Sequence, residues 1–172
     1  RALPRGDGLA DLRLYAREQL LAALGELAAG GEALLALARR HGDVPMVGRT
    51  HMQPAMPSSV GLWAGGFAEM ILDDVKGLAA LYPYLDQSPL GSGAGYGTPL
   101  PLDRELSARL MGFGRLQNNV AYGGLSRGKF ESRLVDALDQ VAISLSKMAA
   151  ELILFSLPEF GWFTLPQELC TG

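Results

Sequence analysis

An apolar repeat close to the C-terminal end constrains the fold of this chain more than any other feature of its sequence. Apolar residues recur there at alternating spacings of four and three, which is typical of an α-helix that packs along other helices. Adjacent positions are also apolar, so only a narrow polar side remains, and such a helix needs neighbours on several sides. We therefore predict a long bundle helix that is covered in part by helices of other subunits. The repeat consists of Leu134, Leu138, Val141, Leu145, Met148, Leu152 and Phe155, with Pro158 after it.

Two more helical patterns precede this repeat. Apolar residues recur every three or four positions from about Asp7 to Arg40, which predicts one long helix that stops at Gly42. Gly30-Gly31 within it costs roughly 1 kcal/mol per glycine relative to alanine, so this helix either kinks there or is closely approached by another helix. A further helix is predicted from about Ser59 to Asp86, because a serine oxygen can accept from the free amides of a first helical turn.

These patterns predict an all-α fold in which long antiparallel helices form part of an intersubunit helical bundle. We expect residues 1–172 to form a single helical domain, since this length suits one domain and 48% of the residues are hydrophobic. The net charge is -3 and the charged residues are spread along the chain. Nucleic acid is excluded as a partner, because its binding depends on a basic face that contacts phosphates.

Cysteine content and hydropathy indicate in which cellular compartment the protein is expected. Cys170 is the only cysteine, so an internal disulfide is impossible, and we predict a cytoplasmic protein. No uninterrupted apolar run approaches the ~20 residues of a membrane span, and Arg1 to Asp7 lack the apolar core of a signal peptide. We therefore expect no membrane partner. The Asp, Glu and His residues show no metal-ligand spacing, so we expect neither a metal nor another cofactor.

A dense group of polar side chains lies between the first two predicted helices. Thr50, His51 and Gln53 fall within a connection, Asp43 to Pro57, that we expect to be a loop or a short extended segment. A lone histidine in a loop is more often a hydrogen-bonded residue than a catalytic one. Here a hydroxyl and a carboxamide stand beside an imidazole that titrates near neutrality, and this set suits an anionic substrate handled without a metal.

A glycine-rich segment, Gln87 to Leu102, predicts a loop whose backbone amides are free to donate. It lacks the Gly-Lys-Ser/Thr of a phosphate-binding loop, and no strand is predicted before it, as dinucleotide binding would require. Its amides can still bind a carboxylate, as amide-rich turns do. Asp103 is expected to cap a short helix that continues to Met111, and Gln117 to Gly128 predicts a broken helix or a loop.

Both stretches resemble the argininosuccinate lyase family, which belongs to the superfamily of fumarase, aspartase and adenylosuccinate lyase. The match from Gly48 to Ser59 is shared across that superfamily, whereas Ser88-Pro89-Leu90-Gly91 and Pro101-Leu102-Asp103-Arg104-Glu105 point to the argininosuccinate branch. Shorter matches extend the resemblance over nearly the whole chain. They are Asp11-Leu12-Arg13-Leu14-Tyr15, Leu125-Ser126-Arg127-Gly128-Lys129 and Glu159-Phe160-Gly161.

The resemblance implies elimination of fumarate from argininosuccinate to give arginine, a carbon-nitrogen lyase reaction of arginine biosynthesis. Thr50 would contact the fumarate-side carboxylate, His51 would polarise the substrate or handle a proton, and Gln53 would bind substrate. Ser92 falls in the second site-forming region of the superfamily. The resemblance also places three residues near the site as substrate-binding positions, namely Asn119, Ser126 and Arg127.

The resemblance further implies an assembly. In the family each site is built by three chains of a homotetramer, so we expect a homo-oligomer that acts on a small molecule. The family's catalytic serine lies on a loop that begins Gly-Ser-Ser, and this chain stops at Cys170-Thr171-Gly172, where that loop would begin. We therefore expect these residues, as the central helical portion, to be inactive alone. Arg5-Gly6-Asp7-Gly8 stands where the family has Arg-Asn-Asp-Gln.

Two other interpretations remain open. Adenylosuccinate lyase or another superfamily member would share the first motif, although the stretch from Ser88 to Gly91 and Asp103 to Glu105 argues against it. A non-catalytic helical oligomerisation module would keep the helices without using the polar side chains. An assay of activity on argininosuccinate and adenylosuccinate distinguishes the first interpretation from an argininosuccinate lyase. Oligomerisation without binding of fumarate or arginine would indicate the non-catalytic module.

Overall fold

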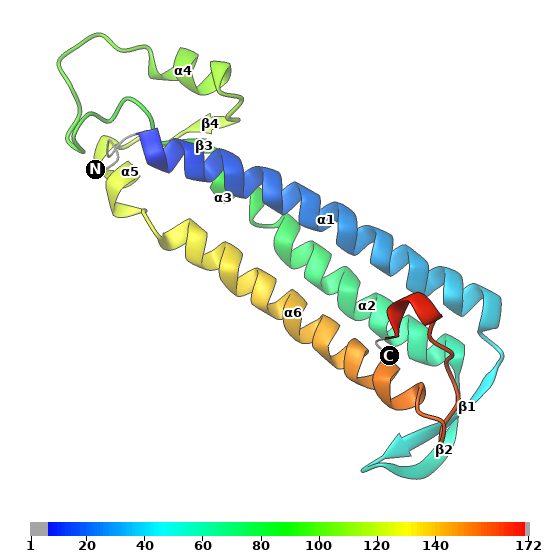
Figure 1. The fold of residues 1–172 in the computed structure, drawn as a ribbon. Helices are drawn as coiled ribbons and strands as arrows, with labels where there is room; N and C mark the ends of the chain where they lie inside the picture. The colour runs from blue at the N-terminus through cyan, green and yellow to red at the C-terminus, as the bar shows by residue number, and fades with distance from the viewer. Residues whose placement is uncertain (1–6, 171–172) are drawn as a thin grey trace. The chain divides into compact units, whose positions relative to one another are not determined.

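A computed structural model describes residues 7–170 of the chain (Figure 1). These residues form mostly α-helix with two small two-stranded sheets, which confirms the predicted helical fold class. The long helices are α1 Asp7–His41, α2 Val60–Ala79 and α6 Lys129–Phe155. The other elements in chain order are β1 Pro45–Thr50, β2 Gln53–Ser59, α3 Tyr82–Leu85, β3 Gln87–Ser88, α4 Arg104–Leu110, β4 Arg115–Leu116, α5 Val120–Leu125 and the 3-10 helix η1 Gln167–Leu169.

The chain groups into two compact units. The first unit combines Arg1–Glu26 with Val75–Leu138, and the second combines Leu27–Asp74 with Asp139–Gly172. Helices α1, α2 and α6 each supply residues to both units. The single domain over residues 1–172 stays a prediction, and Arg5-Gly6 lies outside the described residues.

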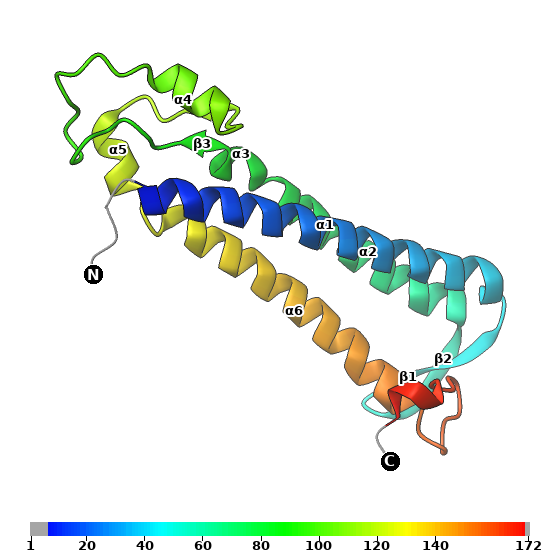
Figure 2. The ribbon, with the colours of Figure 1, turned by 45° about the horizontal axis from the view of Figure 1, so that its top comes forward.

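In the second unit, the C-terminal half of α1 and the N-terminal half of α2 run antiparallel, side by side (Figures 1 and 2). A Cβ atom placed on Gly31 would lie 3.5 Å from Cγ2 of Ile71, and one on Gly61 would lie 2.9 Å from the backbone of Gly42. Helix α1 continues unbroken through its glycine pair. The contact at Gly31 is an ordinary van der Waals distance, so a small side chain would fit there, whereas the close approach of Gly61 to the Gly42 backbone leaves no room for one.

The predicted extent of α2 is wrong at its C-terminal end. We expected the helix to continue to Asp86, but α2 ends at Ala79 and the short α3 follows. Pro83 explains the interruption, because it has no amide N–H to donate to the Ala79 carbonyl oxygen and its ring clashes with that carbonyl four residues earlier. The predicted start is confirmed, since the Leu62 amide donates to the Ser59 hydroxyl at 3.1 Å and so caps the helix.

Helix α6 carries apolar side chains on two faces. Val141 is 8% exposed, whereas Leu138 and Leu145 of the predicted repeat are each 41% exposed. An exposed series of apolar residues at spacings of three and four shares Leu138 and Leu145 with the predicted repeat, and we name it the α6 stripe. Burial of the α6 stripe against helices of other subunits stays a prediction. The α6 stripe consists of Val135, Leu138, Ala142, Leu145 and Ala149.

Aromatic side chains hold the C-terminal segment within the second unit. The Trp63 indole N–H donates to the Glu151 carboxylate at 2.6 Å, and the Trp63 ring lies 4.9 Å from that of Phe163. Phe155, the last residue of α6, lies 6.4 Å from the same Phe163 ring. The chain therefore leaves α6 and turns back over it, and Phe160 to Pro166 form neither a helix nor a strand.

By length and composition, α1 could cross a membrane. Within Gly8–His41, an 18-residue window has a mean hydropathy of 1.6 and is 17% buried. Bundle helices of soluble proteins pass the same test, and Arg13 of α1 is fully buried inside the first unit. The absence of a membrane partner stays a prediction.

Candidate functional site

The hairpin formed by β1 and β2 carries Thr50, His51 and Gln53 at its tip (Figure 1). The strands pair antiparallel with Thr50 opposite Gln53, so His51 and Met52 form a two-residue loop. The side chains of all three predicted site residues are exposed. The hairpin confirms the expected short extended segment and presents the polar group to solvent.

Both loop residues adopt a backbone conformation that residues with a side chain rarely take. The φ angle is 51° at His51 and 66° at Met52, and positive values at both positions define type I′ turns, which favour asparagine and glycine. Each non-glycine residue in this region costs on the order of 1–2 kcal/mol. Such residues concentrate at functional sites, so this loop is the strongest local indication of a site in the second unit.

Arg49 supports the loop from the side. Its Nη1 donates to the Met52 carbonyl oxygen at 3.1 Å, and its guanidinium carbon lies 4.5 Å from the centre of the Phe160 ring. A register shift separates Gly48 from Arg49. A Cβ atom on Gly48 would lie 2.8 Å from the Met56 carbonyl oxygen, which explains the glycine. No local pattern predicts this role for Arg49, because its partner Phe160 is remote in the chain.

Ser92 lies in a loop whose backbone requires glycine. Gly91, Gly93, Gly95 and Gly97 all have positive φ angles, between 60° and 103°. The Ser92 carbonyl oxygen accepts from the Gly95 amide at 3.2 Å and from the Gly97 amide at 2.9 Å. The predicted loop is confirmed from Pro89 onward, whereas Gln87 and Ser88 form β3, and the expectation of free amides is wrong for Gly95 and Gly97. The loop turns back on itself, and both amides bond to it internally.

Asn119 and Arg127 lie on either side of α5. The Asn119 side-chain oxygen accepts from the Ala121 amide at 2.9 Å and caps the N-terminus of this helix. Arg127 follows the C-cap residue of the same helix, and both Asn119 and Arg127 are exposed. The short α5 confirms the predicted broken helix and places these two side chains on the surface of the first unit.

Ser126 lies in the interior of the first unit. It is fully buried, and its hydroxyl oxygen accepts from Nη2 of Arg13 at 3.2 Å and from Nε2 of Gln117 at 3.1 Å. Nη1 of Arg13 also donates to the Gln87 carbonyl oxygen at 2.8 Å. Burial lowers the pKa of the Arg13 guanidinium, while the carboxylate of Glu131 raises it. Ser126 thus stabilises the interior here, and its substrate-binding role stays a prediction.

Arg13 was not among the predicted site residues, although the sequence around it carries a signal. Arg13 falls at helical spacing among the buried residues Leu9, Ala16 and Leu20, whereas neighbouring Leu12 is 43% exposed. A charged residue on an apolar face indicates a buried polar network, because an unpaired buried charge is costly. The helical spacing by itself therefore predicts that Arg13 is buried and hydrogen-bonded.

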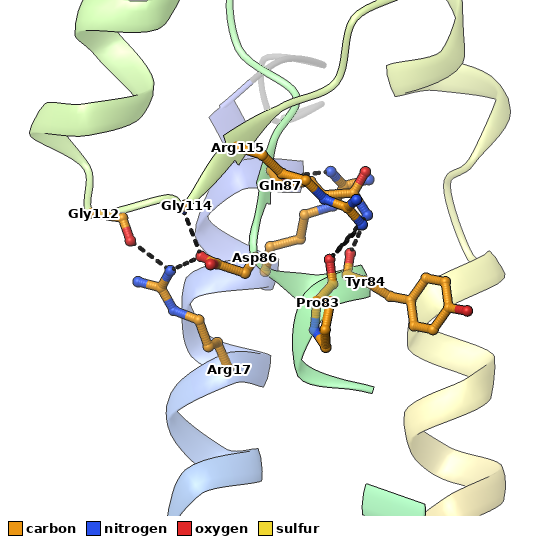
Figure 3. A network of polar contacts seen from close by, with 9 residues as sticks. Arg17, Pro83, Tyr84, Asp86, Gln87, Gly112, Gly114 and Arg115 are labelled. Atoms are coloured by element: carbon orange, nitrogen blue, oxygen red, sulfur yellow. Dashed lines mark hydrogen bonds and ion pairs between the residues drawn. The ribbon is translucent and has the colours of Figure 1, made fainter. Parts of the chain in front are cut away.

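A second polar network in the first unit joins α1 to the segments around α4 (Figure 3). Arg17 forms an ion pair with Asp86 and donates to the Gly112 carbonyl oxygen at 2.6 Å. The Asp86 carboxylate also accepts from the Gly114 amide at 3.0 Å. The segment that contains the glycine-rich loop and α4 begins after Asp86 and ends near Gly112. These bonds therefore attach both of its ends to α1.

The predicted site residues are shared between the units. The hairpin residues belong to the second unit, and Ser92, Asn119, Ser126 and Arg127 belong to the first. Within residues 7–170, no group of three or more His, Cys, Asp or Glu side chains is arranged to hold a metal ion. The catalytic and substrate-binding roles of all these residues stay predictions.

Comparison with known sequences places the chain among lyases. Residues 10–171 match a protein-family model described as "Lyase". An argininosuccinate lyase from Thermotoga neapolitana is 47% identical over 77% of this chain and 33% of its own length. One from Phocaeicola vulgatus is 43% identical over 95% of this chain and 37% of its own length. The chain therefore spans about a third of the length of these relatives.

Solved structures share the fold. A variant of EDDS lyase with bound fumarate superposes with a TM-score of 0.85 and 28% identity, over 91% of this chain and 31% of that chain. A fumarate lyase from Mesorhizobium sp. BNC1 gives a TM-score of 0.71 at 23% identity, over 93% of this chain and 38% of that chain, which is a similarity of fold. Since the family match covers almost every residue, the chain belongs to the lyase family of the fumarase/aspartase superfamily.

Proposed function

We propose that the protein containing this chain eliminates fumarate from argininosuccinate and releases arginine. The observation that carries the proposal is the strained His51-Met52 loop, beside which Thr50 and Gln53 are exposed. The relatives named argininosuccinate lyase support the same substrate. Because the chain spans about a third of those relatives, the activity is proposed for the whole protein.

The reaction removes a proton from the carbon next to a carboxylate and then breaks the carbon-nitrogen bond. The electron pair left on carbon spreads onto that carboxylate, so the transition state carries additional negative charge there. The Thr50 hydroxyl and the Gln53 carboxamide can donate to carboxylate oxygens, and His51 can polarise the substrate or hold a proton. A hairpin that holds these groups in place before substrate binds lowers the barrier, because they need no reorganisation.

The first unit supplies the remaining contacts in this proposal. Ser92, Asn119 and Arg127 lie on or near its surface and offer a hydroxyl, a carboxamide and a guanidinium to an anionic substrate. The resemblance assigns proton removal to a serine on a loop that begins Gly-Ser-Ser, and no residue described here takes that role. We therefore propose that these residues alone are inactive and that the complete site includes that loop.

The α6 stripe supports self-association as part of the proposal. Its residues are apolar, exposed and spaced as in helices that pack along one another. Removing such surface from water contributes about 25 cal/mol per Å² of apolar area. We propose a cytoplasmic homotetramer in which several chains contribute to each site.

Purified native protein supplied with argininosuccinate and, separately, with adenylosuccinate tests the proposed reaction. Release of fumarate from argininosuccinate, followed by its ultraviolet absorbance, is the expected result. Preferential release of fumarate from adenylosuccinate would indicate that the protein belongs to another branch of the superfamily. An oligomer that releases fumarate from neither substrate, and binds neither fumarate nor arginine, would support the oligomerisation module instead.

A further inference from the structure

In the first unit, a short parallel pairing joins the two segments that lead to Ser92 and Asn119. Strand β3 pairs with β4, and the Gln117 amide continues the pairing by donating to the Ser88 carbonyl oxygen at 3.0 Å. Pro89 comes next and has no amide N–H, so it cannot extend a ladder of backbone hydrogen bonds. Beyond this point the two segments need another link if their separation is to stay constant.

The side chain of Arg104 provides that link. Its Nε donates to the Leu90 carbonyl oxygen at 2.9 Å, which lies on the β3 side. Its Nη2 donates to the Gln117 carbonyl oxygen at 2.9 Å and its Nη1 to that of Asn118 at 3.3 Å, both on the β4 side. Carbonyl oxygens only accept hydrogen bonds, so they cannot form one with each other. A guanidinium presents several donors in one plane and can therefore join all three carbonyl oxygens.

Local packing fixes Arg104 in this position. The Asp103 carboxylate accepts from the Leu106 amide at 2.8 Å and caps α4, so the first turn from which Arg104 projects is well defined. Gly91 has a φ angle of 76°, and a Cβ atom there would lie 2.6 Å from Cγ of Arg104. The glycine thus leaves room for the arginine stem to pass across the loop.

We propose that Arg104 is a positioning residue that sets the separation between Ser92 and Asn119. Ser92 lies two positions after Leu90, and Asn119 directly follows Asn118 and caps α5. Arg104 acts on both through backbone carbonyl groups. The inference rests on the proposed function, because it assigns a purpose to the geometry of two proposed substrate-binding residues.

Steady-state kinetics of the native protein with argininosuccinate test this role. Arg104→Met removes every donor, and Arg104→Lys keeps the charge but not the planar set of donors. We expect both to lower kcat/KM, by about a hundredfold for Arg104→Met, mainly through a higher KM. Added guanidinium ion is expected to restore part of the activity of Arg104→Ala, whereas methylammonium at the same concentration is not. Arg109→Met is the matched control, since Arg109 is exposed on the same helix.

Hydrogen exchange supplies a readout that needs no substrate. The Gly95 and Gly97 amides bond to the Ser92 carbonyl oxygen, so they report the loop directly. We expect them to exchange faster in Arg104→Lys than in the unaltered protein or in Arg109→Met, while the amides of α6 exchange at unchanged rates. If Arg104→Met fails to fold, Arg104→Lys and the guanidinium experiment decide.

The outcomes separate this inference from the proposed function. If the unaltered protein releases no fumarate from argininosuccinate, the proposed function fails, and unchanged loop exchange in Arg104→Lys would overturn the positioning role independently. If the unaltered protein is active, kinetic constants of both Arg104 variants within twofold of its own would overturn the inference alone. A loss of thermal stability with unchanged KM and no guanidinium effect would make Arg104 purely structural, which also overturns it.

Discussion

At the scale of single residues, His51 offers the most direct test of the proposed chemistry. Its imidazole is exposed beside Thr50 and Gln53 on a loop with a positive φ angle. Replacing His51 with alanine in the native protein is expected to lower the rate of elimination by about two orders of magnitude, the scale of a positioned acid or base. Fumarate release under saturating argininosuccinate measures this rate.

His41→Ala is the control for that experiment, because His41 is the other histidine and lies exposed at the end of α1. It should leave the rate unchanged. Turnover of His51→Ala close to that of the unaltered protein would remove His51 from the mechanism.

Met52 tests the strain in the loop rather than the chemistry. A glycine at this position tolerates the observed φ angle of 66°, so Met52→Gly is expected to raise the free energy of unfolding by about 1 kcal/mol. Thermal or urea unfolding measures the change. Met56→Gly on strand β2 of the same hairpin should instead lower stability by roughly 0.5–1 kcal/mol, since glycine weakens a strand. Equal effects of the two substitutions would argue against a strained loop.

At the scale of elements, the hairpin and α2 meet at Ser59. Its hydroxyl accepts from the Leu62 amide at 3.1 Å and satisfies one of the free donors of the first turn. Ser59→Ala is expected to lower the free energy of unfolding by about 1 kcal/mol. Urea denaturation of the two proteins would show this as a lower midpoint with an unchanged slope. Ser58→Ala, one residue earlier, is the comparison and should have a smaller effect; the reverse order would contradict the cap.

At the scale of the whole molecule, the α6 stripe is the surface on which proposed self-association depends. Leu145→Glu places a charge among exposed apolar side chains that the assembly would bury, and an unpaired buried charge is costly. We expect this variant to dissociate at micromolar concentration, where the unaltered protein sediments as an oligomer. Gln140→Glu adds the same charge to an exposed position of α6 outside the stripe and should leave the assembly intact. A monomeric unaltered protein would contradict the proposal.

Local sequence signals predicted most of the helical elements, because their causes are local. Apolar spacing indicated α1 and α6, Ser59 and Asp103 indicated helix starts, and the glycines after Leu90 indicated a loop. A helix cap involves residues within one turn, a glycine acts through its own backbone freedom, and helical spacing is recognised from positions three and four apart. The one clear error in extent, α2 beyond Ala79, also has a local cause in Pro83, whose effect the apolar pattern concealed.

The sequence by itself determined where the long helices α1 and α6 lie and where α2 begins, and that Thr50, His51 and Gln53 lie together on a connection between helices. Only the tertiary structure decided that this connection is a hairpin with His51 in a strained loop, and that Ser126 is buried against Arg13. It also decided that Arg104 joins two segments through carbonyl oxygens up to 14 positions away. Helical periodicity arises from neighbouring residues, whereas these arrangements depend on partners that only folding brings together, and no spacing in the chain specifies them.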